Sequence, residues 1–242
     1  MRCGVMKSKK KKVIGIYGGL GPAATDDLNI HITKLVPVTK DQDHPRRVVI
    51  YAPDTPDRTR ALLHGDEDPL PIMKEVVKEL EKAGATVIGI PCNTAHAFLP
   101  KIQKSTRVPI VNMIEVAVLA IKKNHKKVKK VGILATTGTI KTKIYSDMLT
   151  THGFDPVVPD DSNQEIVMDG IYGKDGVKQT SQWTKTANQK FKKVANHLIK
   201  QGAQVIIMGC TEIPLALSDG DVKTLLVNPT KELAKTLITY VA

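Results

Sequence analysis

The amino-acid sequence predicts an α/β protein made of two similar halves, each with a mostly parallel sheet flanked by helices. Apolar runs of strand length alternate with helical patterns of about 10 to 15 residues, which is typical of parallel sheets covered on both faces. A short pattern also occurs twice, as Pro-Cys-Asn-Thr at 91–94 and as Gly-Cys-Thr-Glu at 209–212. Each copy follows a glycine-led apolar run, at Gly15 and at Gly132, by nearly the same number of residues.

The first half begins with an apolar run and a glycine-rich turn. Its expected elements are, in order, a strand at 13–17, a helix at 25–35, a strand at 48–51, a helix at 71–83, a strand at 85–90, a helix through 96 and 98, and a further strand–helix unit at 108–111 and 114–123. The helix at 71–83 is predicted because Ile72, Val76 and Leu80 recur at helical spacing, and Gly84 is suited to end it.

The second half repeats this scheme. Its expected elements are a strand at 131–134, a helix at 140–151, a long polar stretch at 159–164, a helix at 186–200, a strand at 203–208, a strand at 224–227 and a closing helix at 231–240. We expect a first domain from residues 13–107 and 222–242, and a second domain from residues 108–221. Residues 1–12 are expected to form a basic, disordered tail.

Composition and charge restrict the partners of the chain. Its 242 residues are 41% hydrophobic and 25% charged, which is typical of a soluble globular protein. Because no run of about 18 apolar residues occurs, we expect a cytoplasmic protein that does not enter a membrane. The net charge of +12 is concentrated in lysines at 7–12 and 122–130, and aromatic residues make up only 4%. Base stacking and phosphate clamping are therefore poorly provided for, and we expect no nucleic-acid partner.

The three cysteines, an odd number without close regular spacing, predict neither a disulfide framework nor a zinc site. Cys3 lies in the expected tail, whereas Cys92 and Cys210 follow predicted strands. Ligands of parallel α/β folds bind beyond the carboxyl ends of the strands, where the loops at 18–21 and 136–139 are also expected. Two thiols in matching places of two halves predict a site between the halves. There, one thiolate would remove a proton and the other thiol would return it from the opposite face.

Five ordered motifs resemble those of the aspartate/glutamate racemase superfamily, and of its aspartate racemases in particular. They are GIYGGLGPAAT at 15–25, PDRT at 56–59, PCNTAH at 91–96, ATTGT at 135–139 and GCTE at 209–212. The resemblance implies racemisation of aspartate without pyridoxal phosphate, metal or any other cofactor. It also implies two domains related by a pseudo-twofold axis, an active site in the cleft between them, and a homodimer.

The resemblance gives four residues a role in the chemistry. Cys92 and Cys210 match the two catalytic cysteines, and each is expected to precede a helix whose N–H groups stabilise a thiolate. Asp57 and Glu212 match the acidic residues beside them, which help to orient the base. The alternatives are that Asp57 caps a local turn and that Glu212 is an ordinary first-turn acid.

The expected substrate contacts centre on Arg58, which matches an arginine that grips the side-chain carboxylate of aspartate. A guanidinium holds a carboxylate through two hydrogen bonds, as a lysine does not. Lys178 is the expected second cation, with Lys174 as the alternative. The other expected contacts are Thr59, Asn93, Thr94, Ala95, Thr137 and Thr211.

Other interpretations of the motifs are weaker. His96 is expected to pack inside its helix, because no acyl-transfer constellation accompanies a Cys92–His96 pair. The glycines at 18–21 fit neither a P-loop nor a dinucleotide fingerprint. Two other functions stay open: a broad-specificity racemase that accepts glutamate or other amino acids, and a non-catalytic protein that binds small acids.

Overall fold

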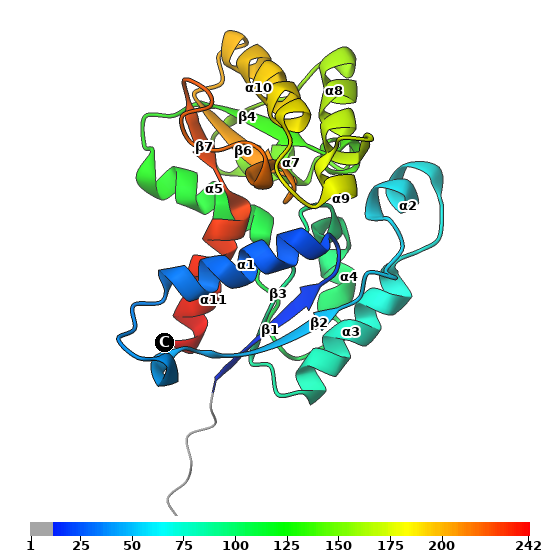
Figure 1. Ribbon diagram of the computed structural model, residues 1–242, viewed down its shortest axis with the longest axis vertical. Coiled ribbons are helices and arrows are strands. Elements are labelled where there is room, and N and C mark those ends of the chain that lie inside the picture. Colours follow the sequence, from blue (N-terminus) through cyan, green and yellow to red (C-terminus); the bar gives the residue numbers. More distant parts are fainter. Residues whose placement is uncertain (1–11) are drawn as a thin grey trace, which may run out of the picture.

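A computed structural model describes residues 12–242 and contains two parallel sheets, one in each half of the chain. Figure 1 shows the first half, with strands β1 to β3, below the second half, with β4 to β7. Cys3 and the expected tail, apart from Lys12, lie outside the described residues. The predicted α/β class, with helix-flanked parallel sheets, is confirmed.

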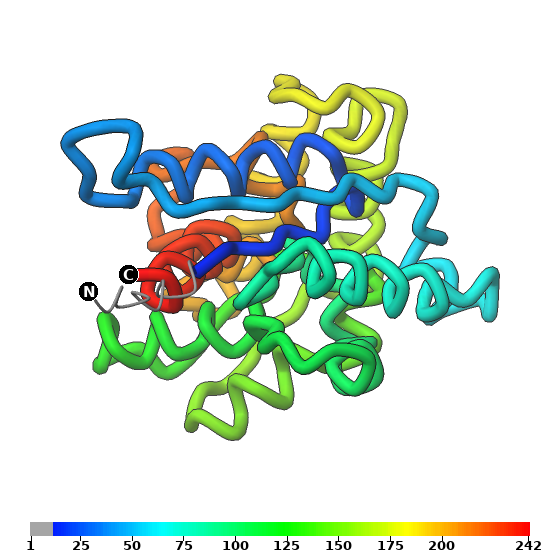
Figure 2. The backbone as a smooth tube through the Cα atoms, turned by 90° about the horizontal axis from the view of Figure 1, so that it is seen from below, coloured from blue at the N-terminus to red at the C-terminus, as the bar shows by residue number. Residues whose placement is uncertain are grey.

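The first sheet has the strand order β2-β1-β3. Its strands are β1 (Val13–Gly18), β2 (Arg46–Tyr51) and β3 (Val87–Gly89). Helices α1 (Pro22–Leu35) and α3 (Leu70–Lys82) cover opposite faces of this sheet (Figure 2). The remaining elements of this half are η1 (Asp41–Asp43), α2 (Arg58–His64), η2 (Thr94–Phe98) and α4 (Leu99–Gln103), where η denotes a 3₁₀ helix.

Helix α3 shows why the helix predictions of the first half succeed. Met73, Val76 and Leu80 are buried against the sheet, at the spacing of one helix face. Gly84 follows the helix with a φ of +91°, a conformation that glycine adopts without strain.

The second sheet has the strand order β5-β4-β6-β7. Its strands are β4 (Lys130–Ala135), β5 (Asp155–Val157), β6 (Val205–Gly209) and β7 (Leu225–Val227). Side chains alternate along β6, so that Ile206 packs with α8 and α10 while Ile207 packs with α5 and α7. The helices of this half are α5 (Met113–Asn124), α6 (Thr137–Lys141), α7 (Ile144–Thr151), α8 (Asp161–Tyr172), α9 (Val177–Thr180), α10 (Lys185–Lys200), η3 (Ile213–Leu215) and α11 (Pro229–Val241).

Two segments of the second half differ from the expected elements. The single helix expected at 140–151 is divided into α6 and α7, because Lys143 between them has a left-handed φ of +57°. The polar stretch at 159–164 contains the start of α8, where the Asp160 side chain accepts a hydrogen bond from the Asn163 N–H (2.9 Å). Asp, Ser and Asn occur in loops and at helix starts alike, so the stretch alone did not reveal the helix.

Strand pairing and packing describe the segments beside the expected domain boundaries at 108 and 222. Segment 108–111 contributes one parallel bridge, between Ile110 and Ile88 at the edge of the first sheet. Within 222–242, β7 pairs with β6 in the second sheet, whereas α11 packs against α1 of the first half. The domain boundaries themselves stay a prediction.

The ends of the described chain lie close together (Figure 2), and the Lys12 Nζ donates a hydrogen bond to the Ala242 carbonyl (2.9 Å). Within residues 12–242, no helix combines the length and the apolar character that a membrane crossing requires.

Candidate active site

Both predicted catalytic cysteines lie just beyond the carboxyl end of a strand. Cys92 comes shortly after β3, and Cys210 comes directly after β6. Both are free thiols and both are buried, with exposed fractions of 7% and 5%. They line one small cavity of about 10 Å³, which is room for about one water molecule. The fold thus brings the two thiols to a single site between the halves.

Most of the predicted site residues line the same cavity. Besides the two cysteines these are Asp57, Arg58, Thr59, Asn93, Thr94, Lys178, Thr211 and Glu212. Leu20, Thr136 and Tyr172 complete the lining. The first half supplies residues from the loop after β1, the start of α2 and the turn after β3. The second half supplies them from the ends of β4, α8 and β6 and from α9.

Two predicted contacts lie elsewhere. Ala95 is buried in the hydrophobic core of the first half. The Thr137 hydroxyl accepts a hydrogen bond from the Gln164 Nε2 (3.2 Å), and the residue lines a groove between α6, α7 and α8. Thr136 takes its place at the cavity, where its hydroxyl caps the first turn of α6. Side chains of successive residues at a helix start differ in direction by about 100°. The motif alone therefore did not show which of the two threonines faces the cavity.

The second cation of the site is Lys178, on α9, whereas Lys174 does not line the cavity. The Lys178 Nζ forms an ion pair with the Glu212 Oε1 at 2.7 Å, and both side chains are largely buried. Burial acts to lower the pKa of Lys178, but the negative charges of Glu212 and of the other acidic groups of the site together raise it. Lys178 is therefore a permanent positive charge at the site.

The thiol of Cys210 has a negatively charged neighbour. Its Sγ donates a hydrogen bond to the Glu212 Oε2 (2.9 Å), and the Thr211 hydroxyl donates to the same oxygen (3.2 Å). Burial raises the pKa of Cys210 well above its ordinary value, and the charge of Glu212 adds to this. Burial also acts to raise the pKa of Glu212, but the charge of Lys178 and the hydrogen bonds to the carboxylate together lower it. The site thus holds a protonated Cys210 beside an ionised Glu212.

The neighbour of Cys92 is the Arg58 guanidinium. Burial lowers the pKa of Arg58, but the negative charge of Cys92 and then that of Asp57 outweigh it, and the pKa is raised. The guanidinium is held in place by three backbone carbonyls, those of Thr55, Pro56 and Leu20, each at 3.0 Å. Among the described residues, the Arg58 Nε has no hydrogen-bond partner. Cys92 therefore faces a fixed positive charge.

The expected helix after each cysteine is replaced by a short 3₁₀ turn. These turns are η2 after Cys92 and η3 after Cys210. η2 leads directly into α4, which has Pro100 in its first turn, and Pro214 lies within η3. Turns of this length have little aligned dipole. The local charges are therefore set by Arg58, Lys178 and Glu212 rather than by helix ends.

Hydrogen bonds between side chains join the two halves beside the thiols. The Thr94 hydroxyl bonds with those of Thr136 (3.0 Å) and Thr139 (2.9 Å). The Tyr145 hydroxyl donates to the Asn93 Oδ1 (2.6 Å). The Asn93 Nδ2 is buried and has no partner among the described residues, so it is a donor available to a bound acceptor.

Asp57 is both a helix cap and a residue of the site. Its Oδ1 accepts from the Arg60 N–H at the start of α2 (2.8 Å), and its Oδ2 accepts from the Tyr172 hydroxyl (3.2 Å). His96 packs as expected, with its Nδ1 2.9 Å from the Cys92 carbonyl oxygen and its Nε2 accepting from the Met113 N–H (3.1 Å). Burial lowers the pKa of His96.

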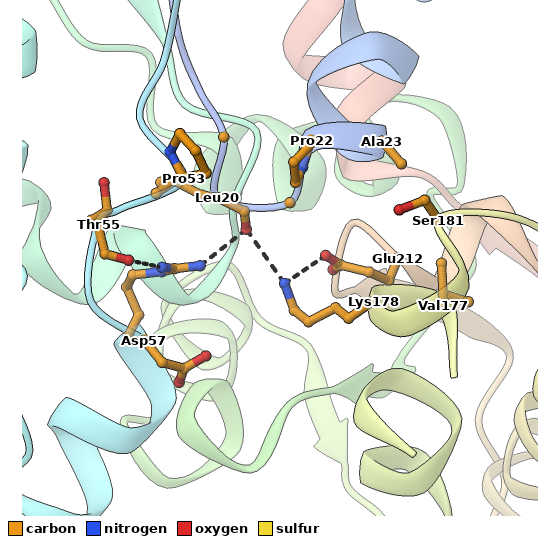
Figure 3. Close-up of a pocket in the computed structure, with 13 residues that line it drawn as sticks. Leu20, Pro22, Ala23, Pro53, Thr55, Asp57, Val177, Lys178, Ser181 and Glu212 are labelled. Carbon is orange, nitrogen blue, oxygen red and sulfur yellow. Dashed lines mark hydrogen bonds and ion pairs between the residues drawn. The ribbon is translucent and has the colours of Figure 1, made fainter. Parts of the chain in front are cut away.

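A wider pocket of about 350 Å³ leads to the inner cavity and shares Leu20, Asp57, Arg58, Lys178 and Glu212 with it. Figure 3 shows Lys178 between the Leu20 carbonyl and Glu212. The Leu20 oxygen accepts from the Arg58 Nη2 (3.0 Å) and from the Lys178 Nζ (3.4 Å). Two cations thus converge on one oxygen, and the pocket has the size of a small-molecule site.

Gly21 allows the close contact between the two halves at this pocket. Its φ is +145°, and a Cβ there would lie 2.4 Å from the Glu212 Oε1. A side chain at this position would displace the carboxylate that pairs with Lys178. The glycine-rich loop therefore serves the approach of Glu212, which explains why it matches no nucleotide-binding pattern.

Sequence reasoning missed Tyr172 and Thr136 as site residues. Tyr172 ends a helix that the polar stretch concealed, and its partner Asp57 is 115 positions away in the sequence. Within residues 12–242, no group of three or more His, Cys, Asp or Glu side chains is arranged to hold a metal ion.

A family model described as Asp/Glu/hydantoin racemase matches residues 18–237, which include both cysteines and every residue that lines the cavity. The chain belongs to this family. The broad-specificity amino-acid racemase RacX of Bacillus subtilis is 32% identical over 235 residues, with 95% of this chain and 99% of the relative covered. The match therefore extends over both halves.

Solved structures agree with this placement. The aspartate racemase of Picrophilus torridus has a TM-score of 0.83 and 31% identity, with 95% of this chain and 94% of that chain covered. The glutamate racemase of Aquifex pyrophilus shares the fold, with a TM-score of 0.56, 20% identity, and coverage of 95% and 84%. The protein is accordingly an amino-acid racemase, an isomerase.

Proposed function

We propose that the protein racemises aspartate without a cofactor, by a two-base mechanism in which Cys92 and Cys210 exchange roles. The observation that carries the proposal is the pair of buried thiols on one cavity with opposite charged neighbours. Such an arrangement supplies one base and one acid, which inversion at a carbon atom requires. The likeness to the Picrophilus torridus aspartate racemase supports aspartate as the substrate.

In one direction the Cys92 thiolate removes the proton from Cα, and the electrons of the C–H bond delocalise into the α-carboxylate. The Cys210 thiol then gives its proton to the opposite face of the planar carbon. One S–H bond forms as the other breaks, so the net charge of the site does not change. The other enantiomer follows the reverse route. Lys178 beside Glu212 offsets the negative charge on Cys210 once its proton has left.

Two donors without partners favour an acid as the ligand. The Asn93 Nδ2 and the Arg58 Nε are buried and have no hydrogen-bond partner among the described residues. Buried donors are nearly always paired, and a substrate carboxylate supplies acceptors for both. Charge that builds up on the α-carboxylate during the reaction strengthens such bonds.

The side-chain carboxylate of aspartate is proposed to bind where the two cations meet. In the free protein the Arg58 Nη2 and the Lys178 Nζ both donate to the Leu20 oxygen. A carboxylate that enters from the wider pocket replaces this single neutral acceptor with two charged ones. Because the inner cavity has room for about one water molecule, binding also requires its lining to open.

The alternative is a racemase of broad specificity, and the broad specificity of the Bacillus subtilis relative favours it. Its 32% identity is about as high as the 31% of the aspartate racemase. Homodimer formation, a cytoplasmic location and independence from pyridoxal phosphate are further predictions from the resemblance and the composition. A non-catalytic acid binder is distinguished by turnover alone.

Racemisation of aspartate, glutamate and alanine by wild type and by Arg58→Ala separates these functions. Aspartate specificity predicts that Arg58→Ala lowers kcat/KM for aspartate about 100-fold more than for alanine, because a charged hydrogen-bonding partner is lost. Arg60→Ala is the matched control, since Arg60 lies on the same helix, pairs with Asp66 (2.6 Å) and does not line the site. Equal losses on all three substrates favour the broad-specificity racemase, and a wild type inactive on all three contradicts both.

A further inference from the structure

Tyr172 contacts two charged side chains of the site, Asp57 and Lys178. It is the last residue of α8 and lines the inner cavity together with the two cysteines. Its hydroxyl donates to the Asp57 Oδ2 at 3.2 Å. Its ring lies below the Lys178 ammonium, with 5.6 Å between the Nζ and the ring centroid, which is within the range of a cation–π contact.

These contacts connect Tyr172 to the two cations by different routes. Asp57 is the N-cap of α2, and Arg58 is the first residue of that helix. The hydroxyl of Tyr172 therefore ties the start of α2 in the first half to the end of α8 in the second. The ring meets Lys178, whose other contacts are Glu212 and the Leu20 carbonyl. Tyr172 lies between the helix that carries Arg58 and the ammonium of Lys178.

Tyr172 stays a hydrogen-bond donor under all working conditions. Burial raises its pKa, Lys178 lowers it and Asp57 raises it again, with a net upward shift. In its bond with an ionised carboxylate, a protonated phenol is the donor, and a hydrogen bond to a charged acceptor is stronger than one between neutral groups. The bond to Asp57 is thus a directional link rather than a chance contact.

We propose that Tyr172 is a positioning residue that sets the separation of Arg58 and Lys178 and thereby selects substrates with an acidic side chain. This inference rests on the proposed function in one respect, that the two cations receive the side-chain carboxylate. Without the hydroxyl, the start of α2 loses its link to α8, and the two cations no longer converge on one place. Acidic ligands lose both charged contacts, whereas ligands with an uncharged side chain lose neither.

The test compares succinate, which has two carboxylates, with butyrate, which has one, by isothermal titration calorimetry on the full chain. Tyr172→Phe keeps the ring below Lys178 and removes the hydroxyl. We expect it to weaken succinate binding about tenfold and butyrate binding less than about twofold, since a hydrogen bond to a charged group is lost. Racemisation assays should show the same split, with a selective loss of kcat/KM on aspartate relative to alanine.

Variants of Asp57 separate the link to Tyr172 from the capping of α2. Asn and Ser both cap helices well, so Asp57→Asn and Asp57→Ser retain α2. With its oxygen on the Arg60 N–H, the Asn side chain presents its Nδ2 to Tyr172, whose hydroxyl then accepts, so a weaker neutral link remains, whereas the shorter Ser does not reach Tyr172. We expect Asp57→Ser to reproduce the selectivity of Tyr172→Phe, and Asp57→Asn to stay nearer to wild type. Tyr51→Phe is the tyrosine control, because Tyr51 is exposed and bonds to Asp26 away from the site.

The outcomes distinguish this inference from the proposed function. Selective weakening of succinate supports the role of Tyr172, whether or not the wild type racemises aspartate. Equal weakening of succinate and butyrate, or no effect of Tyr172→Phe on either, overturns it even if the wild type is an active racemase. Failure of the wild type to bind succinate more tightly than butyrate overturns it as well. Absence of racemisation by the wild type contradicts the proposed function.

Discussion

Cys92 and Cys210 occupy corresponding places at the ends of β3 and β6, but their surroundings differ in charge. Cys92 faces the Arg58 guanidinium, while Cys210 donates its proton into a hydrogen bond with Glu212. Both are almost equally buried, so exposure does not distinguish them. The two halves thus repeat a position in the fold without repeating its chemistry. In the proposed mechanism, the two enantiomers of the substrate therefore meet two bases that are not equivalent.

The difference suggests a resting state in which the protons are already assigned. Cys210 is buried beside a carboxylate and keeps its proton, so it rests as the acid of the pair. In the proposed mechanism, the free protein is then ready for the enantiomer whose Cα–H points at Cys92. The other enantiomer requires the less populated form, in which Cys210 is the thiolate.

The largest predicted effect is the loss of stability caused by Glu212→Gln, which removes the charged neighbour of Cys210. Loss of the carboxylate leaves Lys178 largely buried without its counter-ion, which should lower the free energy of unfolding by about 3 kcal/mol. Glu232→Gln is the matched control, because Glu232 pairs with Lys235 at the same 2.7 Å but Lys235 is 45% exposed. There the loss should be about 0.5 kcal/mol. Chemical denaturation measures both, and equal losses would contradict the buried pair.

The same variant has a defined pH dependence. Burial acts to raise the pKa of Glu212, but Lys178 and the hydrogen bonds to the carboxylate together depress it below its ordinary 4.5. Its stabilising contribution is therefore fully present above about pH 4.5 and is lost as the pH falls through the lower pKa of the folded state. The difference in unfolding free energy between wild type and Glu212→Gln should shrink on acidification. An increase of this free-energy difference at acidic pH would contradict a lowered pKa of Glu212 in the folded protein.

A smaller predicted effect is a difference between the alkylation rates of Cys92 and Cys210. Iodoacetamide reacts with thiolates, so at about pH 7.5 Cys92 should be modified roughly tenfold faster than Cys210. Glu212→Gln should reduce the difference between the two alkylation rates, because the pKa of Cys210 falls when the negative charge is removed. Peptide mass mapping against time measures both rates. Faster labelling of Cys210 than of Cys92 in the wild type would contradict the proposal that Cys210 is the thiol that rests protonated.

Regular patterns made much of the fold predictable from sequence. Helix α3 carries apolar side chains at helical spacing, strand β6 is an unbroken apolar run, and the paired Cys motifs identified the two strand ends that meet at the site. The resemblance named most of the residues that line the cavity, including Arg58 and Lys178, but not Tyr172 or Thr136. These features depend on local spacing or on short contiguous motifs.

The rest depends on information that local patterns do not carry. The polar start of α8 has the composition of a loop, and the break at Lys143 has no glycine to signal it. β7 joins the second sheet because the edge of β6 is free to pair there, which is a tertiary effect. The contact between Tyr172 and Asp57 spans 115 positions, and no local sequence pattern at either residue predicts it.

The most direct test of the two-base mechanism is solvent exchange at Cα of L- and D-aspartate in D₂O, without added cofactor. NMR follows loss of the Cα–H signal, and chiral chromatography follows inversion. The wild type should exchange and invert both enantiomers. Cys92→Ala and Cys210→Ala should each lose inversion by about 1,000-fold, as expected when a catalytic acid or base is removed. Cys210→Ala, which keeps Cys92, should still exchange one enantiomer without inverting it, and Cys92→Ala should exchange far less of either. Inversion that survives in a single variant, or equal exchange by both variants, would contradict the two-cysteine mechanism and the unequal roles of its two thiols.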